Sequence, residues 1–583
     1  MVVNAESAYE GGNPQTVRGR ALRRLQALKT EASPWRTKWK DIARFEHPYL
    51  GRFNVTDRNM AAWDDGDMID NTPMYASGVL AAGFMGGVTS PARPWFRAGL
   101  KDPDLMERQA VKQWCHDTTS LILSIFAASN VYRSLHQTYE ELGLFATSAT
   151  ILDPDFDTVI HASPLTIGEY YLSANAKGVV DTMYREFQMT VEQMIGKFGY
   201  DKVSDAVRNL YDRGSYDTWV DVVHFIEPRK KRDLKRAHVP RHMAFTSTYI
   251  DPADHRPDAV LLEGGRKRFP VLAPRWATVG RDTYGSNNPG MRALGDSKSL
   301  QAAHIDKAEA MDYRLHPPLQ IPNKLRDNPS ARLPGGSFYV DNTQASMGIR
   351  SAWEVNVRTD ELLADIADQR ERVNRAFFVQ LFLMAANDDR SGTTATEIAE
   401  RHEEKLLMIG PVLERLNSEL LEPLIDITFD YAAEAGILPP IPSELQGGEE
   451  LEIEFINVLS QAQKIVATRG NERFIQGVAT MAQIEAASGK APSVLKKVDF
   501  LQAADELAAA YGADPRIVVS DDVINKQLAD EQRMAQMQQM AAAAQPTAQY
   551  AKAAKDVSGV DTDNAQQVLT QLMGYGSPSP QEV

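Results

Sequence analysis

The residues that could support catalysis are few, and their spacing fits no known catalytic site. A phosphate-binding loop places a lysine and then a serine or threonine after glycines at fixed spacing. The nearest candidate, Gly489-Lys490, lacks the upstream glycine and is followed by Ala491. The sequence therefore predicts no ATP-binding loop, and we expect that the chain does not itself draw power from ATP.

Metal ligands and activated nucleophiles are equally sparse. His402 precedes two glutamates, but no second histidine lies four residues after it, as the helix of a zinc protease requires. Cys115 is the single cysteine, and its neighbour His116 would point in another direction on a helix. We interpret Cys115 as a core residue, and we expect no catalytic residue, no metal and no cofactor. The sequence does not predict an enzyme.

Two charged segments remain as candidates for binding. The first is basic and consists of a run and a triplet: Arg229, Lys230, Lys231, Arg232, Lys235, Arg236, Arg266, Lys267 and Arg268. Such a cluster in an acidic protein favours docking on an acidic partner or brief contact with phosphates. The alternative is that these are solvated loop charges without a ligand.

The second segment is a polar loop between two long predicted helices. It consists of Asn387, Asp388, Asp389, Arg390, Ser391 and Gly392. Aspartate, serine and glycine favour a turn over continued helix, and Thr394 with Glu397 can form a capping box for the next helix. The two helices hold the ends of the loop and leave its middle free. The alternative is a plain surface connection.

The composition describes a folded protein that does not grip nucleic acid. The chain has 583 residues, too many for one core, and carries 63 basic and 78 acidic residues for a net charge of −15. Proteins that hold phosphates tightly are usually basic. A single cysteine, a polar N-terminus and the lack of a long apolar run lead us to expect a soluble intracellular protein without a signal peptide or membrane span.

The elements that position these segments are predicted to form an α+β fold that is mostly helical. Capping residues before prolines predict two N-terminal helices, one beginning at Asn13-Pro14 and the other at Ser33-Pro34. A helix rich in small residues and an amphipathic helix through Trp114 follow. Runs of β-branched and aromatic residues predict strands at 149–152, 158–161, 170–172 and 181–187, which we expect to form one small antiparallel sheet.

Residues 217–283 are predicted to form a separate β-rich module with a hairpin turn at Gly264-Gly265. Its predicted strands are 219–226, 244–250, 260–263 and 269–271. The segments predicted after it are a helix from Pro289 to the Pro317-Pro318 pair, long helices at 359–385 and 394–434, and a strand at 451–456. The C-terminal end is rich in alanine, glutamine and methionine, and we expect its last residues to be disordered.

One segment carries a more specific signal. Small residues between positions 76 and 83 allow close helix packing, and two X-Pro pairs then end the helix and direct Trp95-Phe96 into a core. The segment resembles the N-terminal block of podovirus-type bacteriophage portal (head-to-tail connector) proteins, where a helix of small residues ends in Thr-x-Pro-x-x-x-Trp-Phe. The matching residues are Thr89, Pro91, Trp95 and Phe96.

Further blocks resemble this family in the same order along the chain. They are 29–31 with 39–44, 189–194 with 198–199, 269–276 with 284–285 and 289–290, and 394–398. After the block that corresponds to 269–276, the family usually has Tyr-Gly-Arg. In this chain Tyr284-Gly285 is followed instead by Ser286-Asn287-Asn288. The ordered set of blocks identifies the chain as resembling a portal protein over nearly its whole length.

The resemblance implies a structural protein that forms a ring of twelve copies at one vertex of the capsid in the virion, after assembly in the host cytoplasm. Double-stranded DNA would pass through the ring without sequence preference, during packaging by a separate terminase and during ejection. The other implied partners are the major capsid and scaffolding proteins and the tail adaptor and nozzle proteins, with no membrane. The alternative is a helical virion adaptor or scaffolding protein without a DNA channel.

The resemblance also implies a portal fold with wing, stem, clip and crown. The implied regions are 1–200 for the N-terminal part of the wing, 201–285 for the first stem segment and clip, 286–316 for the second stem helix, 317–457 for the C-terminal part of the wing, and 458–583 for the crown and tail. The basic cluster would then lie in the clip. Residues 387–392 would be the channel loop, where repeated carboxylates let DNA slide because they repel its phosphates.

Overall fold

The described part of the chain falls into two units. The structure is a computed structural model that describes residues 16–62, 68–106, 108–236, 238–254, 256, 259–316, 319–320, 350–351, 359–386, 409–445, 451–455, 474–485, 487, 494–498, 501–504, 519, 523–524 and 526–537. Contacts within the chain separate residues 1–467 from residues 468–583. In the second unit the described residues form helical segments at 474–485, 501–504 and 526–537 and a 3-10 turn, Val494–Lys497. None of the described helices could span a membrane.

One long helix opens the first unit where two were predicted. α1 (Val17–Phe45) continues through Pro34, and its N-terminus is capped by Thr16, whose side chain accepts a hydrogen bond from the Gly19 N–H at 3.1 Å. Proline in a helix interior loses one hydrogen bond and is costly by itself. Burial of Leu28 on one side of Pro34 and Trp39 on the other holds both halves on the same core, so the predicted break was wrong.

The predicted helix of small residues is α2 (Thr72–Gly87), and it packs closely against two other helices. A Cβ on Gly83 would lie 2.2 Å from Cδ1 of Phe382 in α10 (Val379–Ala386). Likewise, a Cβ on Gly143 of α5 (Val131–Phe145) would lie 2.4 Å from Cδ2 of Leu80. The prediction of close packing is confirmed. So is the burial of Trp95-Phe96, whose side chains are almost completely covered.

Antiparallel strands form a five-stranded and a three-stranded sheet. The larger sheet has the order β4 (Tyr170–Ala174), β5 (Val180–Thr190), β6 (Trp219–Pro228), β7 (Phe245–Ile250) and β8 (Leu262–Arg266). The smaller sheet has the order β3 (Val159–Leu165), β2 (Ala149–Asp155) and β9 (Val271–Leu272). A further pair joins β1 (Phe96–Leu100) to β12 (Leu451–Phe455). The predicted strands therefore all exist, near their predicted positions.

The grouping of these strands differs from the prediction. β5 is 11 residues long and pairs with β6 from Met183 to Thr190, so the strands after residue 217 continue the sheet that β4 and β5 begin. β9 instead pairs with β2. The prediction of a separate module at 217–283 was wrong, as was the prediction of one sheet for the first four strands. Strand pairing between distant segments leaves no trace in local alternation.

Gly264 and Gly265 are strand residues, and the predicted hairpin turn at this position was wrong. Both lie in β8 and pair with β7. A Cβ on Gly265 would lie 2.0 Å from the carbonyl oxygen of Pro240, in the 3-10 turn η2 (Pro240–His242). Glycine is needed here because another backbone approaches the strand closely.

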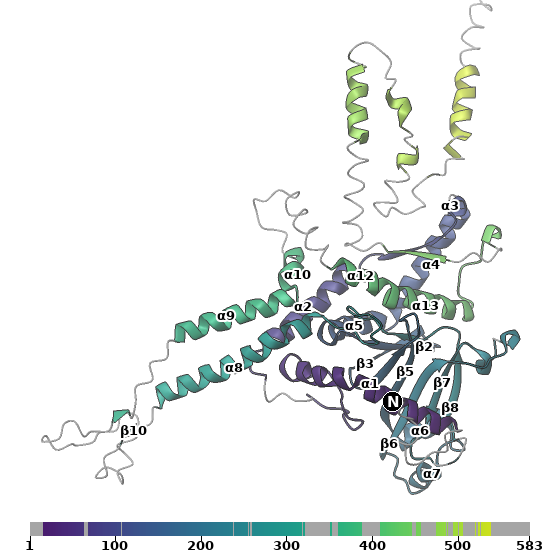
Figure 1. Cartoon of the computed structure of the whole chain (residues 1–583). Coiled ribbons are helices and arrows are strands. Elements are labelled where there is room, and N and C mark those ends of the chain that lie inside the picture. Colours follow the sequence, from purple (N-terminus) through teal and green to yellow (C-terminus); the bar gives the residue numbers. More distant parts are fainter. Residues whose placement is uncertain are drawn as a thin grey trace, which may run out of the picture. The chain divides into compact units, whose positions relative to one another are not determined.

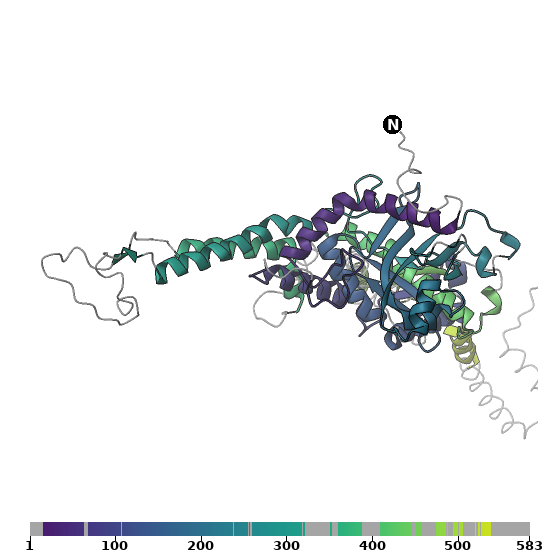
Figure 2. The same ribbon diagram turned by 90° about the horizontal axis from the view of Figure 1, so that it is seen from below.

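Two antiparallel helices form an arm that projects from the other elements of the first unit (Figures 1 and 2). α8 (Pro289–Leu315) confirms the helix predicted from Pro289, and Asn288 caps it by accepting a hydrogen bond from the Met291 N–H at 3.3 Å. α9 (Thr359–Ala376) packs against α8. The helix predicted for 359–385 breaks at Phe378, whose φ of 57° is left-handed, before α10 begins.

A second helical stretch runs from residue 410 to residue 434. It consists of α12 (Gly410–Leu416), a π turn (Asn417–Leu421) and α13 (Glu422–Glu434). The upstream part of this predicted helix, residues 394–408, lies outside the described residues. The remaining elements are the 20-residue helix α4 (Gln109–Ala128) and the short elements α3 (Pro103–Met106), α6 (Val191–Phe198), α7 (Asp205–Asp212), η1 (Leu234–Arg236), η7 (Ser443–Leu445), β10 (Leu319–Gln320) and β11 (Arg350–Ser351).

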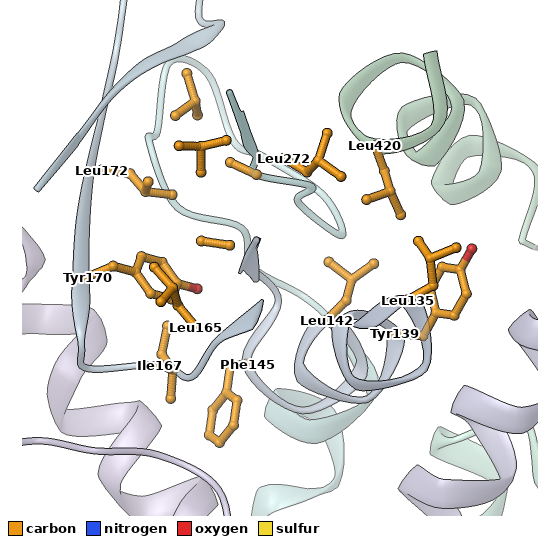
Figure 3. Packing of buried hydrophobic residues seen from close by; sticks show 14 of the residues in the cluster. Leu135, Tyr139, Leu142, Phe145, Leu165, Ile167, Tyr170, Leu172, Leu272 and Leu420 are labelled. Atoms are coloured by element: carbon orange, nitrogen blue, oxygen red, sulfur yellow. The ribbon is translucent and has the colours of Figure 1, made fainter. Parts of the chain in front are cut away.

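The main core lies where α5, both sheets and the π turn meet (Figure 3). α5 contributes Leu135, Tyr139, Leu142 and Phe145, and the other labelled side chains come from the strands and turn around it. Segments as far apart in the chain as Ala21 and Ala432 therefore share one core. The α+β class expected from the sequence is confirmed.

A buried carboxylate ties α5 to the turn between β3 and β4. Glu141 accepts hydrogen bonds from the Thr166 hydroxyl at 2.5 Å and from the Ile167 N–H at 3.1 Å. Thr166 in turn accepts a hydrogen bond from the Gly51 N–H at 2.8 Å. Burial raises the pKa of Glu141 to about 8, so the carboxyl is mainly neutral at pH 7.

Gly83→Ala is expected to destabilise the chain, because the added Cβ would overlap the Phe382 ring. Overpacking of this kind costs about 1–3 kcal/mol. The matched control is Gly78→Ala in the same helix, where no atom lies within 4 Å of the new Cβ. This control should gain about 0.5–1 kcal/mol because alanine favours helix. Urea unfolding of both variants measures the difference, and equal stabilities would contradict close packing at Gly83.

Glu141→Gln is expected to flatten the pH dependence of stability. The pKa of Glu141 is higher in the folded chain than in the unfolded one. Its contribution to the free energy of unfolding is therefore full below about pH 4.5 and is lost as the pH rises through about 8. Glutamine stays neutral and lacks this loss. Urea unfolding at a series of pH values should show that, as the pH rises, the free energy of unfolding of the wild type falls relative to that of the variant by an amount on the order of a few kcal/mol. Parallel pH profiles would contradict the assignment.

Candidate interaction surfaces

The basic triplet predicted as part of a docking site is paired with acids of its own chain. It lies between β8 and β9, beside α13. The ion pairs are Arg266–Asp153 at 2.7 Å, Lys267–Glu434 at 2.7 Å, Arg268–Asp426 at 2.6 Å and Arg268–Asp430 at 2.8 Å. The three acids of α13 are spaced by four residues and therefore share one face of the helix. We call these contacts with α13 the α13 clasp.

The basic run lies in the loop after β6 and differs in its surroundings. Arg229 donates to Glu263 of β8 at 2.8 Å, and Arg236 lies 3.8 Å from Asp233. The other four members are exposed, and the described residues place no ion pair on them: Lys230, Lys231, Arg232 and Lys235. The structure thus divides the predicted cluster into a triplet with internal partners and a run with free charge.

A buried ion pair joins the loop after β9 to the π turn. Nη2 of Arg275 donates to Oε1 of Glu419 at 2.6 Å, and the Arg275 backbone N–H donates to Oε2 at 2.9 Å. The guanidinium also donates to the carbonyl oxygens of Gly178 at 2.9 Å and Asp282 at 3.2 Å. The side chain of Arg275 is 5% exposed. Nothing in local sequence indicates this pair, because its members lie 144 residues apart.

The base of the arm is held by a second buried carboxylate. Asp70 accepts hydrogen bonds from the Thr72 N–H and from Nε of Arg370 in α9, both at 2.8 Å. Nε2 of Gln301 in α8 donates to the Asp70 carbonyl at 2.9 Å. Burial opposes the charge, but the hydrogen bonds from Thr72 and Arg370 outweigh it and hold the pKa of Asp70 below its usual range. Both arm helices are therefore fixed to the start of α2.

The predicted channel loop, residues 387–392, lies outside the described residues. The described chain reaches Ala386 at the end of α10 and continues at Ile409, directly before α12. α10 is anchored by the contact of Phe382 with α2, and the stretch after α12 is anchored by Glu419. Both of its described flanks are therefore held by buried contacts.

Ser247 and His224 form a pair that sequence reasoning missed. They lie on the neighbouring strands β7 and β6, with Nε2 of His224 2.9 Å from Oγ of Ser247. Arg185 donates to Nδ1 of His224 at 3.2 Å, so Nδ1 is the acceptor and Nε2 carries the proton. Burial, with nearby cations, lowers the pKa of His224 well below its usual value. A serine nucleophile needs an unprotonated Nε2 as its base, which this arrangement does not provide.

The remaining reactive residue, Cys115, is buried as predicted, and burial raises the pKa of its thiol to about 11. A thiol with this pKa is a poor nucleophile at neutral pH. Within the described residues, no group of histidine, cysteine and carboxylate side chains could hold a metal ion. The candidates Gly489-Lys490 and His402 lie outside the described residues.

Comparison with known proteins agrees with the order of blocks in the sequence. Residues 18–518 match the family model described as "Bacteriophage head to tail connecting protein". The "Probable portal protein" of Bordetella phage BPP-1 is 48% identical over 526 residues, which cover 90% of this chain and 93% of that protein. The "Portal protein" of Salmonella phage epsilon15 is 37% identical over 547 residues, which cover 94% of this chain and 97% of that protein.

A solved chain from the virion of a native gene transfer agent particle is matched over its full length and over 72% of this chain, with 13% identity and a TM-score of 0.27, too low to compare the folds. The two phage relatives, in contrast, align along nearly their whole length. With the family model also matched over most of the chain, the resemblance predicted from the sequence is confirmed, and this chain belongs to the bacteriophage head-to-tail connecting protein family, as a structural portal protein.

Proposed function

We propose that the chain is the subunit of a portal ring of twelve copies at one capsid vertex, through which double-stranded DNA is packaged and later ejected. The observation that carries the proposal is the near-full-length similarity to two portal proteins. Terminase, capsid and scaffolding proteins, and tail adaptor and nozzle proteins are the proposed partners. The ring assembles in the host cytoplasm and remains in the virion.

The surface of the arm supports assembly into a ring. Several large apolar side chains on the distal half of α8 are exposed in the single chain, among them Ile305 at 43%, Met311 at 39% and Leu315 at 69%. Exposed apolar side chains on a projecting helix favour burial against another chain. In a closed ring, heterologous contacts repeat around the axis and can cover such a surface on every subunit.

In this proposal α8 is the second stem helix and residues 387–392 form the channel loop. Support for the channel role comes from the charge of this loop. Asp388 and Asp389 from every subunit would surround the duplex with carboxylates, which repel phosphates and prevent tight binding. Arg390 would add a weak contact that depends on salt.

The competing function is a helical adaptor or scaffolding protein without a DNA channel. Negative-stain electron microscopy of the purified chain distinguishes the two, and we expect rings with a central hole. A stable monomer in sedimentation at micromolar concentration, in several salts, would contradict the proposal.

The double variant Asp388→Lys with Asp389→Lys is expected to shorten or slow DNA packaging, because lysines facing the channel would bind phosphates. The matched control replaces both residues with asparagine, which removes the charge and still favours a turn. DNA length per particle and the rate of ejection, at fixed salt, measure the effect. Full-length packaging and normal ejection by the lysine variant, with rings of normal form, would show that these carboxylates do not line the path.

A further inference from the structure

A groove of about 820 Å³ lies between the first turns of α1 and the five-stranded sheet. Its floor is formed by residues of β5, β6, β7 and β8, and the first residues of the basic run form one of its walls. Arg20 and Arg24 of α1 contribute to another wall. Figure 2 shows α1 lying across the sheet at this place. The groove thus combines two basic segments that are about 200 residues apart in the chain.

The charge of the groove is positive, and its acids already have partners. Five basic side chains and three acidic ones line it. Glu227 accepts a hydrogen bond from Tyr184 at 2.8 Å and lies 3.9 Å from Arg20, and Glu263 is paired with Arg229. Asp181 accepts a hydrogen bond from the neighbouring Thr182. Lys230 and Lys231 are exposed and have no ion pair with any described residue. An anion in the groove would therefore meet unpaired cations.

Arg229 provides a specific receptor within this groove. Its Nη1 donates to Glu263 at 2.8 Å, while Nε and Nη2 are buried and lack a hydrogen-bond partner. Nε and Nη2 form the side-on edge of a guanidinium, the edge that binds both oxygens of a carboxylate in parallel. Buried donors without partners are rare and call for an explanation. The Arg229 side chain is 16% exposed, and a carboxylate entering the groove would satisfy both donors once this side chain turns its side-on edge towards the groove.

The shape and lining favour a peptide over a DNA duplex. A cavity of about 820 Å³ can enclose a few side chains but not a duplex, which is far wider. Apolar side chains such as Val17, Phe225 and Val260 lie beside the charged ones, as expected for a surface that contacts amino-acid side chains.

We propose that this groove binds an extended acidic segment of a partner protein, with one carboxylate held side-on by Arg229 and others by Lys230, Lys231 and Arg20. The proposal does not depend on ring formation or on DNA in the channel. It assigns a ligand of defined chemistry to Arg229, Lys230 and Lys231 of the basic run, whereas Lys267 and Arg268 of the triplet form the α13 clasp.

The test measures binding of a fluorescein-labelled peptide to the purified full-length chain by fluorescence anisotropy at low salt. The peptide has eight residues, in which aspartate and glutamate alternate. Arg229→Gln is expected to weaken binding about tenfold or more, because a bidentate, charge-assisted contact is lost. Arg229→Lys keeps the positive charge but lacks the two parallel N–H donors of the guanidinium, so this variant should lose nearly as much affinity for the peptide as Arg229→Gln. Lys230→Gln with Lys231→Gln should weaken binding by roughly threefold to tenfold.

The matched control is Arg232→Gln with Lys235→Gln, which removes two charges from the same loop outside the groove lining. It should change affinity by less than about twofold. Thermal melts and light scattering establish that all variants keep the fold and assembly state of wild type.

Three results would overturn the proposal. The first is no binding of the acidic peptide by wild type, and the second is equal loss in the control and in the groove variants. The third is competition between the peptide and a DNA duplex of about 20 base pairs, with Arg229→Gln weakening the binding of the duplex as much as that of the peptide. This result would assign the groove to phosphates.

Discussion

The ion pair of the buried Arg275 with Glu419 joins the C-terminal helices of the first unit to the N-terminal sheets that share its core. Its two members belong to segments that meet only in the folded chain, and both the side chain and the backbone N–H of Arg275 are used. Removing one partner of such a pair leaves an uncompensated buried charge, which commonly costs 3–5 kcal/mol. Carbonyl oxygens of Gly178 and Asp282 accept the remaining donors, so the ion pair is fully hydrogen-bonded. The C-terminal helices are thereby locked to the N-terminal sheets.

The π turn at Asn417–Leu421 accompanies this lock. One extra residue in a helical turn changes the direction of the side chains before and after it, and such turns recur at functional positions. Here the π turn contains Glu419, which reaches Arg275, and Leu420, which points into the core shown in Figure 3. α13 continues from it and carries the acids of the α13 clasp. The clasp is exposed and adds little stability by itself. The buried face of α13, with Leu424, Ile425 and Ile427, decides which side of the helix meets the core.

The acidic residues that surround each basic side chain in the folded chain explain why the basic residues of the cluster have different roles. Arg268 lies where α13 supplies two carboxylates, whereas Lys230 forms no ion pair with any residue that the structure describes. At the base of the arm, Asp70 joins α8 and α9 to α2 through Arg370 and Gln301. α10 and α12, the described helices on either side of residues 387–408, likewise pack against the core.

The sequence alone determined the family, the mixed fold class and most individual elements of this portal protein, because these depend on short-range signals. Runs of β-branched and aromatic residues located the strands, Pro289 and the Pro317-Pro318 pair located α8, and the Trp95-Phe96 block carried the resemblance to portal proteins. The break predicted at Pro34 failed because burial along α1 outweighs one lost hydrogen bond. Only the tertiary structure decided which strands share a sheet, which half of the basic cluster is paired, and that Arg275 meets Glu419. These contacts join residues far apart in the chain, so neither the local periodicity of the sequence nor its charge composition predicts them.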